Sequence, residues 1–316
     1  MSEDNQADTS CVCDSCGIAE SDDIKLKDLD DCDLIRYCSD ECLQIIVSVL
    51  EEDEDCKKRE AELEGLTAEL EEWEKRVAEA RDKLLFQVPE SSHMGDCPIC
   101  MIPLPIYEEK SYLMPCCSKV VCFCCRHAQR KREAELRLPK SCPFCREALC
   151  KTREEYNERR MKRLEMNDPV ALRCKGSDQY DKGDYSSAFE YWRKAAVQGD
   201  AEAHHKLAYL YHDGDGVEKD MEKVIQHLKE AAMAGHPEAR YKLGWHESND
   251  GNIGRAVKHF LIGATQGEDV SIKTLMEMFK DGLINKDALA YALRAHKAAV
   301  DETKSEQRDA ADEYRR

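Results

Sequence analysis

Apolar residues recur every three or four positions along residues 57–88, which is the spacing of one face of a helix. The segment contains no proline and is rich in the helix formers Glu, Lys, Arg, Ala and Leu. The apolar positions alternate three and four apart without a break: Leu63, Leu66, Leu70, Trp73, Val77, Ala80 and Leu84. This heptad pattern predicts either a parallel or antiparallel coiled coil that joins two copies of the chain through 63–84, or a single helix that packs on the chain's own modules.

A second helical pattern fills residues 167–300 and repeats itself. Segments that end in AVQG, AMAG and ATQG place Gly199, Gly235 and Gly267 at intervals of 36 and 32 residues. The additional residues lie in one Gly- and Asp-rich loop, 211–221, which is where stacked helix–turn–helix units tolerate an insertion. The last unit, from Ser271, lacks this ending and is expected to be a terminal cap. We expect the large apolar residues at equivalent positions to form a shared core: Trp192, Leu207, Leu228, Leu243 and Phe260.

The repeated units resemble Sel-one-like repeats, which are relatives of the tetratricopeptide family. The resemblance covers roughly residues 168–300, and AEAHHKLAYLYHDGDGVEKDMEKVIQHLKEAAMAGH at 201–236 carries it most strongly. It implies a right-handed solenoid whose concave face binds another protein.

The charge and cysteine content limit the compartment and the kind of partner. The chain of 316 residues has a formal net charge of −18, which disfavours nucleic acid as the main partner. The beginning of the sequence shows no apolar leader, and no apolar run is long enough to span a bilayer. We therefore expect a reducing intracellular location, cytoplasmic or nuclear, in which most of the 18 cysteines bind metal or stay reduced rather than form disulfides.

Cysteines are densest between residues 97 and 150. Cys97-x2-Cys100 and Cys142-x2-Cys145 are knuckles that place two thiolates on one tight turn. Cys122-x2-Cys125 has the same spacing, and adjacent Cys116 and Cys117 supply one more pair. Eight ligands satisfy two closed tetrahedral zinc sites, whereas a single site would leave four thiols without a role.

The order of these pairs resembles a RING domain, on the motifs CPIC at 97–100, PCC at 115–117, CFCC at 122–125 and CPFCR at 142–146. The resemblance implies a cross-brace, with one zinc on the first and third pairs and the other on the second and fourth. The ligands would then be Cys97, Cys100, Cys122 and Cys125 at one site, and Cys116, Cys117, Cys142 and Cys145 at the other. The position of the usual histidine aligns with Lys119, so an all-cysteine variant is expected, with His127 as an alternative ligand.

The same resemblance implies ubiquitin ligation without a covalent intermediate, through a charged conjugating enzyme that the RING holds in a reactive posture. Ile99 and Pro143 match the apolar contacts for that enzyme, and Arg146 matches the arginine that bridges enzyme and ubiquitin. Gln129 departs from the family pattern, because many active RINGs carry tryptophan or another apolar residue there. The two interpretations that remain are a ligase and a zinc-dependent adaptor without transfer activity.

An N-terminal cluster, CDSCG at 13–17 and RYCSDEC at 36–42, predicts one zinc on Cys13, Cys16, Cys38 and Cys42. The text YCSDEC resembles a MYND finger. A full MYND finger binds a second zinc through further ligands, of which this chain offers only Cys32 and Cys56. These two bind a further zinc or stay free thiols. Four cysteines are expected to bind no metal: Cys11, Cys124, Cys150 and Cys174.

The fold class we expect is therefore small zinc-stabilised modules, a MYND-like finger and a RING cross-brace, followed by an all-α helical-repeat solenoid. The expected boundaries are 11–56 for the finger, 57–90 for the helical spacer, 95–150 for the RING, 167–300 for the repeats and 301–316 for a polar tail. Three zinc ions per chain are expected. The expected partners are a ubiquitin-conjugating enzyme on the RING and an unnamed protein on the repeats.

Overall fold

The computed structural model describes residues 27–29, 32–37, 39–52, 54–106 and 110–315, and the chain divides into two compact units, 1–80 and 81–316. In the first unit, β1 (Lys27–Leu29) and β2 (Cys32–Tyr37) form an antiparallel pair in which Lys27 faces Tyr37. Helix α1 (Asp40–Glu52) follows β2. The Ser39 hydroxyl accepts a hydrogen bond from the Cys42 amide at 3.3 Å and so caps the start of α1.

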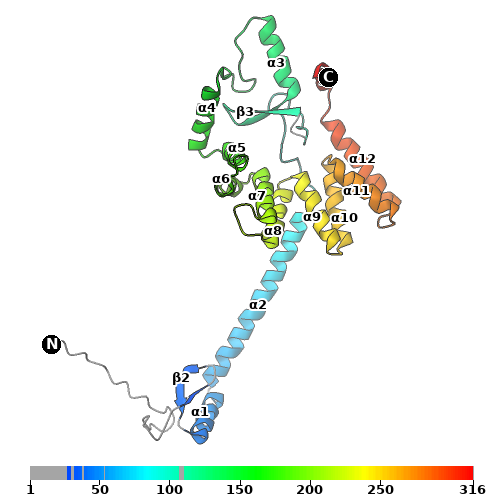
Figure 1. Ribbon diagram of the computed structural model, residues 1–316. Coiled ribbons are helices and arrows are strands. Elements are labelled where there is room, and N and C mark those ends of the chain that lie inside the picture. Colours follow the sequence, from blue (N-terminus) through cyan, green and yellow to red (C-terminus); the bar gives the residue numbers. More distant parts are fainter. Residues whose placement is uncertain (1–26, 30–31, 38, 53, 107–109, 316) are drawn as a thin grey trace, which may run out of the picture. The chain divides into compact units, whose positions relative to one another are not determined.

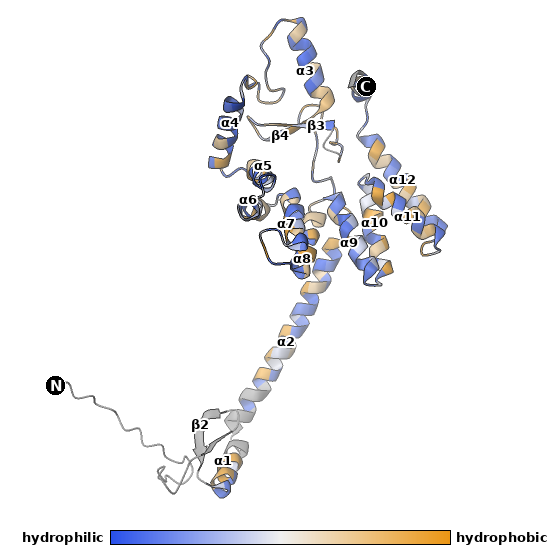
Figure 2. Cartoon of the chain, in the orientation of Figure 1, coloured by the Kyte–Doolittle hydropathy of each residue, from blue (hydrophilic) through white to orange (hydrophobic). Residues whose placement is uncertain are grey.

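Helix α2 (Glu54–Leu85) covers most of the spacer for which the heptad pattern predicts a helix (Figure 1). Apolar residues recur along it, as Figure 2 shows. Five of the seven positions of the pattern are more than half exposed: Leu63, Leu66, Leu70, Trp73 and Leu84. Both interpretations of the stripe, association of two copies and packing on the chain's own modules, therefore stay predictions.

The second unit contains the solenoid that the repeats predict, and this prediction is confirmed (Figure 1). Eight helices follow one another as antiparallel pairs: α5 (Pro169–Tyr180), α6 (Tyr185–Val197), α7 (Ala201–Asp213), α8 (Met221–Met233), α9 (Pro237–Asn249), α10 (Ile253–Thr265), α11 (Asp269–Lys280) and α12 (Lys286–Glu302). Each pair packs on the next, α6 on α7, α8 on α9 and α10 on α11. Helix α4 (Arg153–Glu165) precedes them and contacts α5.

The residues expected in the shared core are buried, each 2% exposed or less: Trp192, Leu207, Leu228, Leu243 and Phe260. Small residues on the facing helices make room for the two aromatic rings. A Cβ added at Gly176 would lie 2.4 Å from Trp192, and one at Gly244 would lie 2.6 Å from Phe260. The size of each of these two aromatic rings is therefore matched by a glycine in the same repeat.

The first helix of each repeat begins at an equivalent capping residue. Asp168, Asp200, His236 and Glu268 lie at intervals of 32, 36 and 32 residues, and each side chain accepts the amide hydrogen of the residue three positions on. Three of the four are acids, which suit the positive end of a helix. His236 caps α9 through a ring nitrogen instead.

The end of α2 packs against the solenoid. Leu85 is 3% exposed and joins a core cluster with Leu228 and Leu243. Its carbonyl accepts a hydrogen bond from the fully buried guanidinium of Arg240. One turn earlier, Asp82 accepts hydrogen bonds from Arg255 at 2.8 Å. The last turn of the spacer helix is thus part of the fold of the repeats.

The cysteine-rich module is built around a hairpin of β3 (Ser111–Met114) and β4 (Lys119–Cys122), followed by α3 (Phe123–Glu135). The polar segment at the end of the chain forms α13 (Glu306–Arg315), which packs against α3. Ala311 on α13 is 6% exposed and joins the core of the module. Among the helices of the described residues, none has the length and apolarity that crossing a membrane requires.

Candidate metal centres

The two CxxC turns of the module have the same backbone geometry. The Met101 amide donates a hydrogen bond to the Cys97 carbonyl at 2.9 Å, and the Arg146 amide donates one to the Cys142 carbonyl at the same distance. Both donors have a left-handed backbone, with φ of 56° and 62°. A short bridge closes each turn, Asp96 with Pro103 and Ser141 with Ala148. Each turn therefore holds its two thiols on one side, as a metal knuckle does.

The fold gathers the eight cysteines into two groups of four. One group is Cys97, Cys100, Cys122 and Cys125, and the other is Cys116, Cys117, Cys142 and Cys145. Within each group the sulfur atoms all lie within 4.8 Å of one another. These groups are the two sets that the RING resemblance implies, first pair with third and second pair with fourth. His127 belongs to neither group, and its ring stacks on Phe123.

The distances between sulfur atoms are too long for disulfides. Cys100 Sγ lies 3.9 Å from Cys122 Sγ, Cys117 Sγ lies 3.9 Å from Cys142 Sγ, and Cys116 Sγ lies 3.3 Å from Cys145 Sγ. A disulfide requires about 2.05 Å. Each group can instead hold one metal ion at its centre.

Burial makes a group of four thiolates unfavourable without a cation. Burial, together with neighbouring thiols that carry negative charge, raises the pKa of Cys125 to about 12 and that of Cys117 to about 11. A bound divalent ion reverses this effect, because it stabilises the deprotonated ligands. The module therefore has the donors of two metal centres.

A cation from the far end of the chain contacts the first group. Arg308 of α13 is 8% exposed, and its Nη2 lies 3.4 Å from Cys100 Sγ. The same guanidinium donates to the carbonyls of Ile102 and Pro103, at 3.1 and 2.7 Å, and to that of Thr303 at 2.6 Å. Sequence reasoning missed this residue, because it placed Arg308 in a polar tail. In the sequence nothing but its positive charge marks Arg308, and the other arginines of the chain carry the same charge.

Two other cations of the module and its extra thiol have the following surroundings. Arg126 stacks over the ring of Tyr112 at 3.8 Å. Lys119 is the first residue of β4, and its side chain is exposed. Cys124, the extra thiol of the CFCC motif, donates to the Gln307 carbonyl at 3.2 Å and thus joins the contact between α3 and α13.

The residues expected to contact a conjugating enzyme lie on the two knuckles. Ile99 is 40% exposed on the first knuckle. Pro143 is half-buried and Arg146 exposed on the second. Phe144, also on the second knuckle, is 42% exposed, so each knuckle has an exposed apolar residue.

Gln129 is part of a polar network. Its Nε2 donates to Glu133 Oε1 at 2.8 Å and to Ser141 Oγ at 3.3 Å. Glu133 is 3% exposed and also accepts from the Ser141 amide at 2.9 Å. Burial alone would raise the pKa of Glu133, but the hydrogen bonds from Ser141 and Gln129 hold it below its ordinary value. Gln129 and Glu133 thus fix α3 to the start of the second knuckle.

The expected N-terminal ligands fall mostly outside the described residues. Cys13, Cys16 and Cys38 lie there, and so does Cys11. Cys42 lies in the first turn of α1. Cys150 and Cys174 lie in neither cysteine group.

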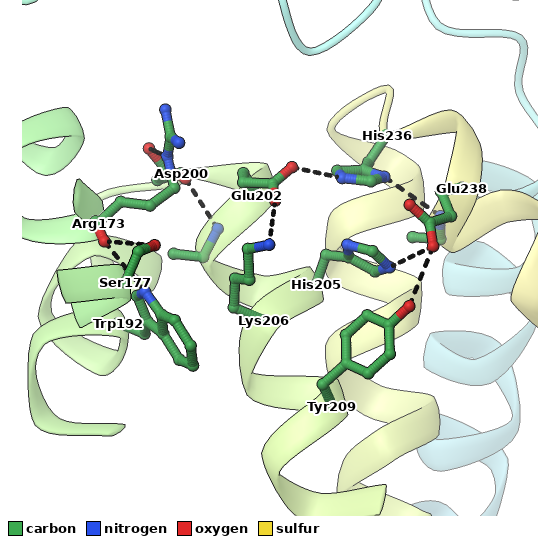
Figure 3. Close-up of polar contacts among 12 residues, drawn as sticks. Arg173, Ser177, Trp192, Asp200, Glu202, His205, Lys206, Tyr209, His236 and Glu238 are labelled. Carbon is green, nitrogen blue, oxygen red and sulfur yellow. Dashed lines mark hydrogen bonds and ion pairs between the residues drawn. The ribbon is translucent and has the colours of Figure 1, made fainter. Parts of the chain in front are cut away.

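A third polar group joins the linker before the first knuckle to the solenoid. His93, Glu202 and His236 each bring one possible ligand atom within 4.8 Å of the other two. The rings of His93 and His236 stack with their centroids 4.4 Å apart, and the centroid of the tilted His205 ring lies 4.3 Å from that of His236. Figure 3 shows His205, Glu202 and His236 between α7 and α9. No sequence motif pointed to this group, because its members come from three separate segments.

Hydrogen bonding assigns this group to packing and not to a metal. His236 Nδ1 accepts the Ala239 amide hydrogen at 3.2 Å, so a neutral ring carries its proton on Nε2. That Nε2 donates to Glu202 at 2.9 Å. Burial would raise the pKa of Glu202, but the bond from His236 outweighs it and lowers the pKa. While His236 caps α9, its Nε2 has no lone pair for a metal.

Several solved structures are similar to this chain, and three of them are described here. A Sel1 repeat protein from Oxalobacter formigenes is 22% identical over 55% of this chain and 71% of its own, with a TM-score of 0.41. The antigen c5321 of uropathogenic Escherichia coli strains, described as an SLR fold, is 20% identical over 52% of this chain and 37% of its own, with a TM-score of 0.36. MamA is 20% identical over 47% of this chain and 87% of its own, with a TM-score of 0.30.

A comparison with curated proteins finds no match. The comparison with protein families finds the Sel1 repeat, at residues 172–200, 201–236 and 237–268. These ranges correspond to the helix pairs α5–α6, α7–α8 and α9–α10. Residues 172–268 therefore form three Sel1 repeats.

Proposed function

We propose that the chain is a zinc-dependent RING-type ubiquitin-protein ligase, in which the cysteine module recruits a charged conjugating enzyme and the Sel1 repeats bind a protein partner. The observation that carries the proposal is the interleaved grouping of the eight cysteines. A regular tetrahedron of thiolates with metal–sulfur bonds of about 2.3 Å has sulfur atoms about 3.8 Å apart. The two longer distances, both 3.9 Å, agree with this spacing.

The chemistry requires orientation and no covalent intermediate on this chain. The amine of a substrate lysine attacks the thioester carbonyl of ubiquitin, the C–S bond breaks, and the cysteine of the conjugating enzyme leaves as a thiolate. In this scheme Ile99 and Pro143 dock the conjugating enzyme, and Arg146 donates hydrogen bonds to enzyme and ubiquitin together. The exposure of Ile99 on the first knuckle turn and of Arg146 on the second supports these roles.

Discharge of a charged conjugating enzyme to free lysine tests the ligase. We expect Ile99→Ala and Arg146→Ala to lower the discharge rate by about 10²-fold, the scale of a lost positioning contact. Leu138→Ala and Arg153→Ala are matched controls, because both residues are exposed outside the knuckles. Equal rates for all four variants would exclude the mechanism, as would inactivity of the wild type with every conjugating enzyme.

A non-catalytic adaptor is the second candidate, and Gln129 favours it. In the position that is apolar in many active RINGs, this chain has an amide bonded to Glu133 and Ser141. If the wild type binds a conjugating enzyme without accelerating discharge, the adaptor is the better description. Sel1 repeats are typical of protein-interaction scaffolds, so both candidates share the solenoid as the partner surface.

Aromatic residues on the solenoid support a protein partner there. A cavity of about 310 Å³ between α7 and α9 is lined by Tyr209, Tyr241 and Trp245, and Trp245 is 51% exposed. Exposed aromatic residues are enriched where proteins bind one another. Trp245→Ala should weaken partner capture, whereas Val197→Ala, at an exposed position outside this cavity, should not.

Native mass spectrometry tests the metal scheme. We expect three zinc ions per chain: two on the cysteine module and one on Cys13, Cys16, Cys38 and Cys42. Cys97→Ser and Cys142→Ser should each remove one ion, whereas Cys174→Ser should remove none. Two ions in the wild type would exclude the N-terminal finger, and four would support a further site on Cys32 and Cys56.

A further inference from the structure

The exposed stripe of α2 lacks a cover in the described chain, although its residues are large and apolar. Leu63 and Leu66 are more than 60% exposed, and Leu70 and Trp73 more than 50%. Contiguous apolar surface on an otherwise charged helix marks an interaction site. Leu85 shows the contrast, because the same helix buries it against the solenoid two turns beyond Val77.

Charges beside the stripe decide how a second helix can lie on it. In heptad terms Leu63, Leu70 and Val77 are a positions, and Leu66, Trp73 and Ala80 are d positions. The g positions that flank one side are acidic in the first half and basic in the second: Glu62, Glu69, Arg76 and Lys83. The e positions that flank the other side are Thr67, Glu74 and Arg81. All of these flanking residues are exposed.

A parallel pair of copies would bring like charges together. In that orientation each g residue faces the e residue five positions on in the other helix. Glu69 would then face Glu74 of the second copy, and Arg76 would face Arg81 of the second copy. Both contacts are repulsive, and two-fold symmetry makes each occur twice.

An antiparallel pair replaces these repulsive contacts with attractive ones. The g residues of the two helices now face one another, so Glu62 meets Lys83 of the second copy and Glu69 meets Arg76 of the second copy. On the other side Thr67 meets Glu74 without a clash of charge. The same alignment layers Leu70 on Trp73 of the second copy, Leu66 on Val77 and Leu63 on Ala80. The largest residue, Trp73, therefore lies opposite the smaller Leu70 of the second copy, at the centre of the seam.

We propose that two copies of this chain associate through an antiparallel coiled coil of α2 centred between Leu70 and Trp73. The symmetric contact covers the exposed stripe and pairs the acidic half of each helix with the basic half of the other. This inference does not depend on ligase activity or on metal binding. The heptad pattern alone leaves the relative direction of the two α2 helices open, and the flanking charges decide it.

Sedimentation equilibrium of the full chain tests the proposal. The wild type should be a concentration-dependent dimer. Glu62→Lys with Glu69→Lys makes every g position basic, and Arg76→Glu with Lys83→Glu makes every g position acidic. Each double variant should be monomeric alone, and an equimolar mixture should restore a dimer that holds one copy of each, detected by native mass spectrometry.

A parallel dimer gives the opposite result. There each double variant exchanges one repulsive contact for an attractive one, so both would dimerise at least as strongly as the wild type. Glu71→Lys with Glu79→Lys changes the net charge as Glu62→Lys with Glu69→Lys does, but at exposed positions outside the seam. This control should leave the dimer intact. The proposal is overturned if the wild type is monomeric at all concentrations, if either double variant stays dimeric, or if mixing restores nothing. Recovery on mixing also shows that both variants are folded.

Discussion

Arg308 Nη2 lies 3.4 Å from Cys100 Sγ, although 208 residues separate them in the chain. The guanidinium also binds the carbonyls of Ile102 and Pro103, so it holds the turn that presents Cys97 and Cys100. A cation in this position offsets the negative charge of a metal bound by four thiolates. Helix α13 is thereby part of the surroundings of the first cysteine group.

Arg308→Ala should therefore weaken metal binding at the first group. Loss of a partner that orients a ligand typically costs 10- to 100-fold in affinity, or about 1.4 to 2.7 kcal/mol. Competition with a chromogenic chelator measures this, with one of two zinc ions expected to leave the cysteine module early. Lys304→Ala is the control, because Lys304 is exposed and pairs only locally with Asp301. Unchanged zinc retention in Arg308→Ala would show that the contact serves packing alone.

The buried carboxylate of Glu133 should stabilise the second knuckle. Its Oε1 accepts from the Ser141 amide, the Ser141 hydroxyl and Gln129. Glu133→Ala leaves those donors without an acceptor, at a cost of about 1 to 3 kcal/mol. Hydrogen exchange at the Ser141 amide should accelerate accordingly. Glu135→Ala, an exposed change on the same helix, should leave that amide protected, and equal exchange in both variants would contradict the assigned role.

Gly176, the small residue opposite Trp192, should be required for the stability of the solenoid. Gly176→Ala places a methyl group 2.4 Å from Trp192, whose Nε1 is fixed by a hydrogen bond to the Arg173 carbonyl at 3.1 Å. The ring cannot move aside without losing that bond, so we expect a loss of about 1 to 3 kcal/mol in thermal or urea unfolding.

Gly254→Ala is the matched change for Gly176→Ala. Gly254 lies in α10, and an added Cβ there meets no atom within 4 Å. Alanine is the better helix former, so this variant should gain about 0.5 to 1 kcal/mol. If both glycine variants shift stability in the same direction, the packing argument for Gly176 is wrong.

Acid should destabilise the solenoid through its buried histidines. Burial lowers the pKa of His93 to about 3 and that of His205 to about 2, from an ordinary value of 6.5. Both are neutral in the folded chain at pH 7, whereas the unfolded chain takes up protons as the pH falls below 6.5. Each histidine therefore costs up to about 1.4 kcal/mol of stability per pH unit between pH 6.5 and pH 3.

Urea unfolding at a series of pH values checks this dependence. His205→Phe should flatten the loss of stability below pH 6.5, because His205 is 3% exposed and neither ring nitrogen has a hydrogen-bond partner among the described residues. His212→Phe is the control, since that side chain is 57% exposed. Identical slopes for the wild type and His205→Phe would contradict the prediction.

The sequence by itself determined where the helices of the spacer and of the repeats lie, and which cysteines pair as metal ligands. The repeat interval identified Trp192, Leu228 and Phe260 as core residues, because equivalent positions in stacked units have equivalent surroundings. The heptad spacing located α2, and the four cysteine pairs indicated two tetrahedral centres. Each of these features depends on residues that lie close together in the chain or recur at a fixed interval, so the periodicity of a helix or the reach of a knuckle suffices to predict it.

Only the tertiary structure decided which distant segments meet. Arg308 contacts Cys100, Leu85 enters the core of the repeats, and His93 stacks on His236. No local pattern marks these contacts, because each depends on where a folded surface leaves room for one side chain. The role of Gln129 was decided in the same way, by Glu133 one turn along α3 and by Ser141 beyond the end of that helix. Sequence periodicity fixes which face of an element is apolar, whereas three-dimensional packing selects the partner that covers it.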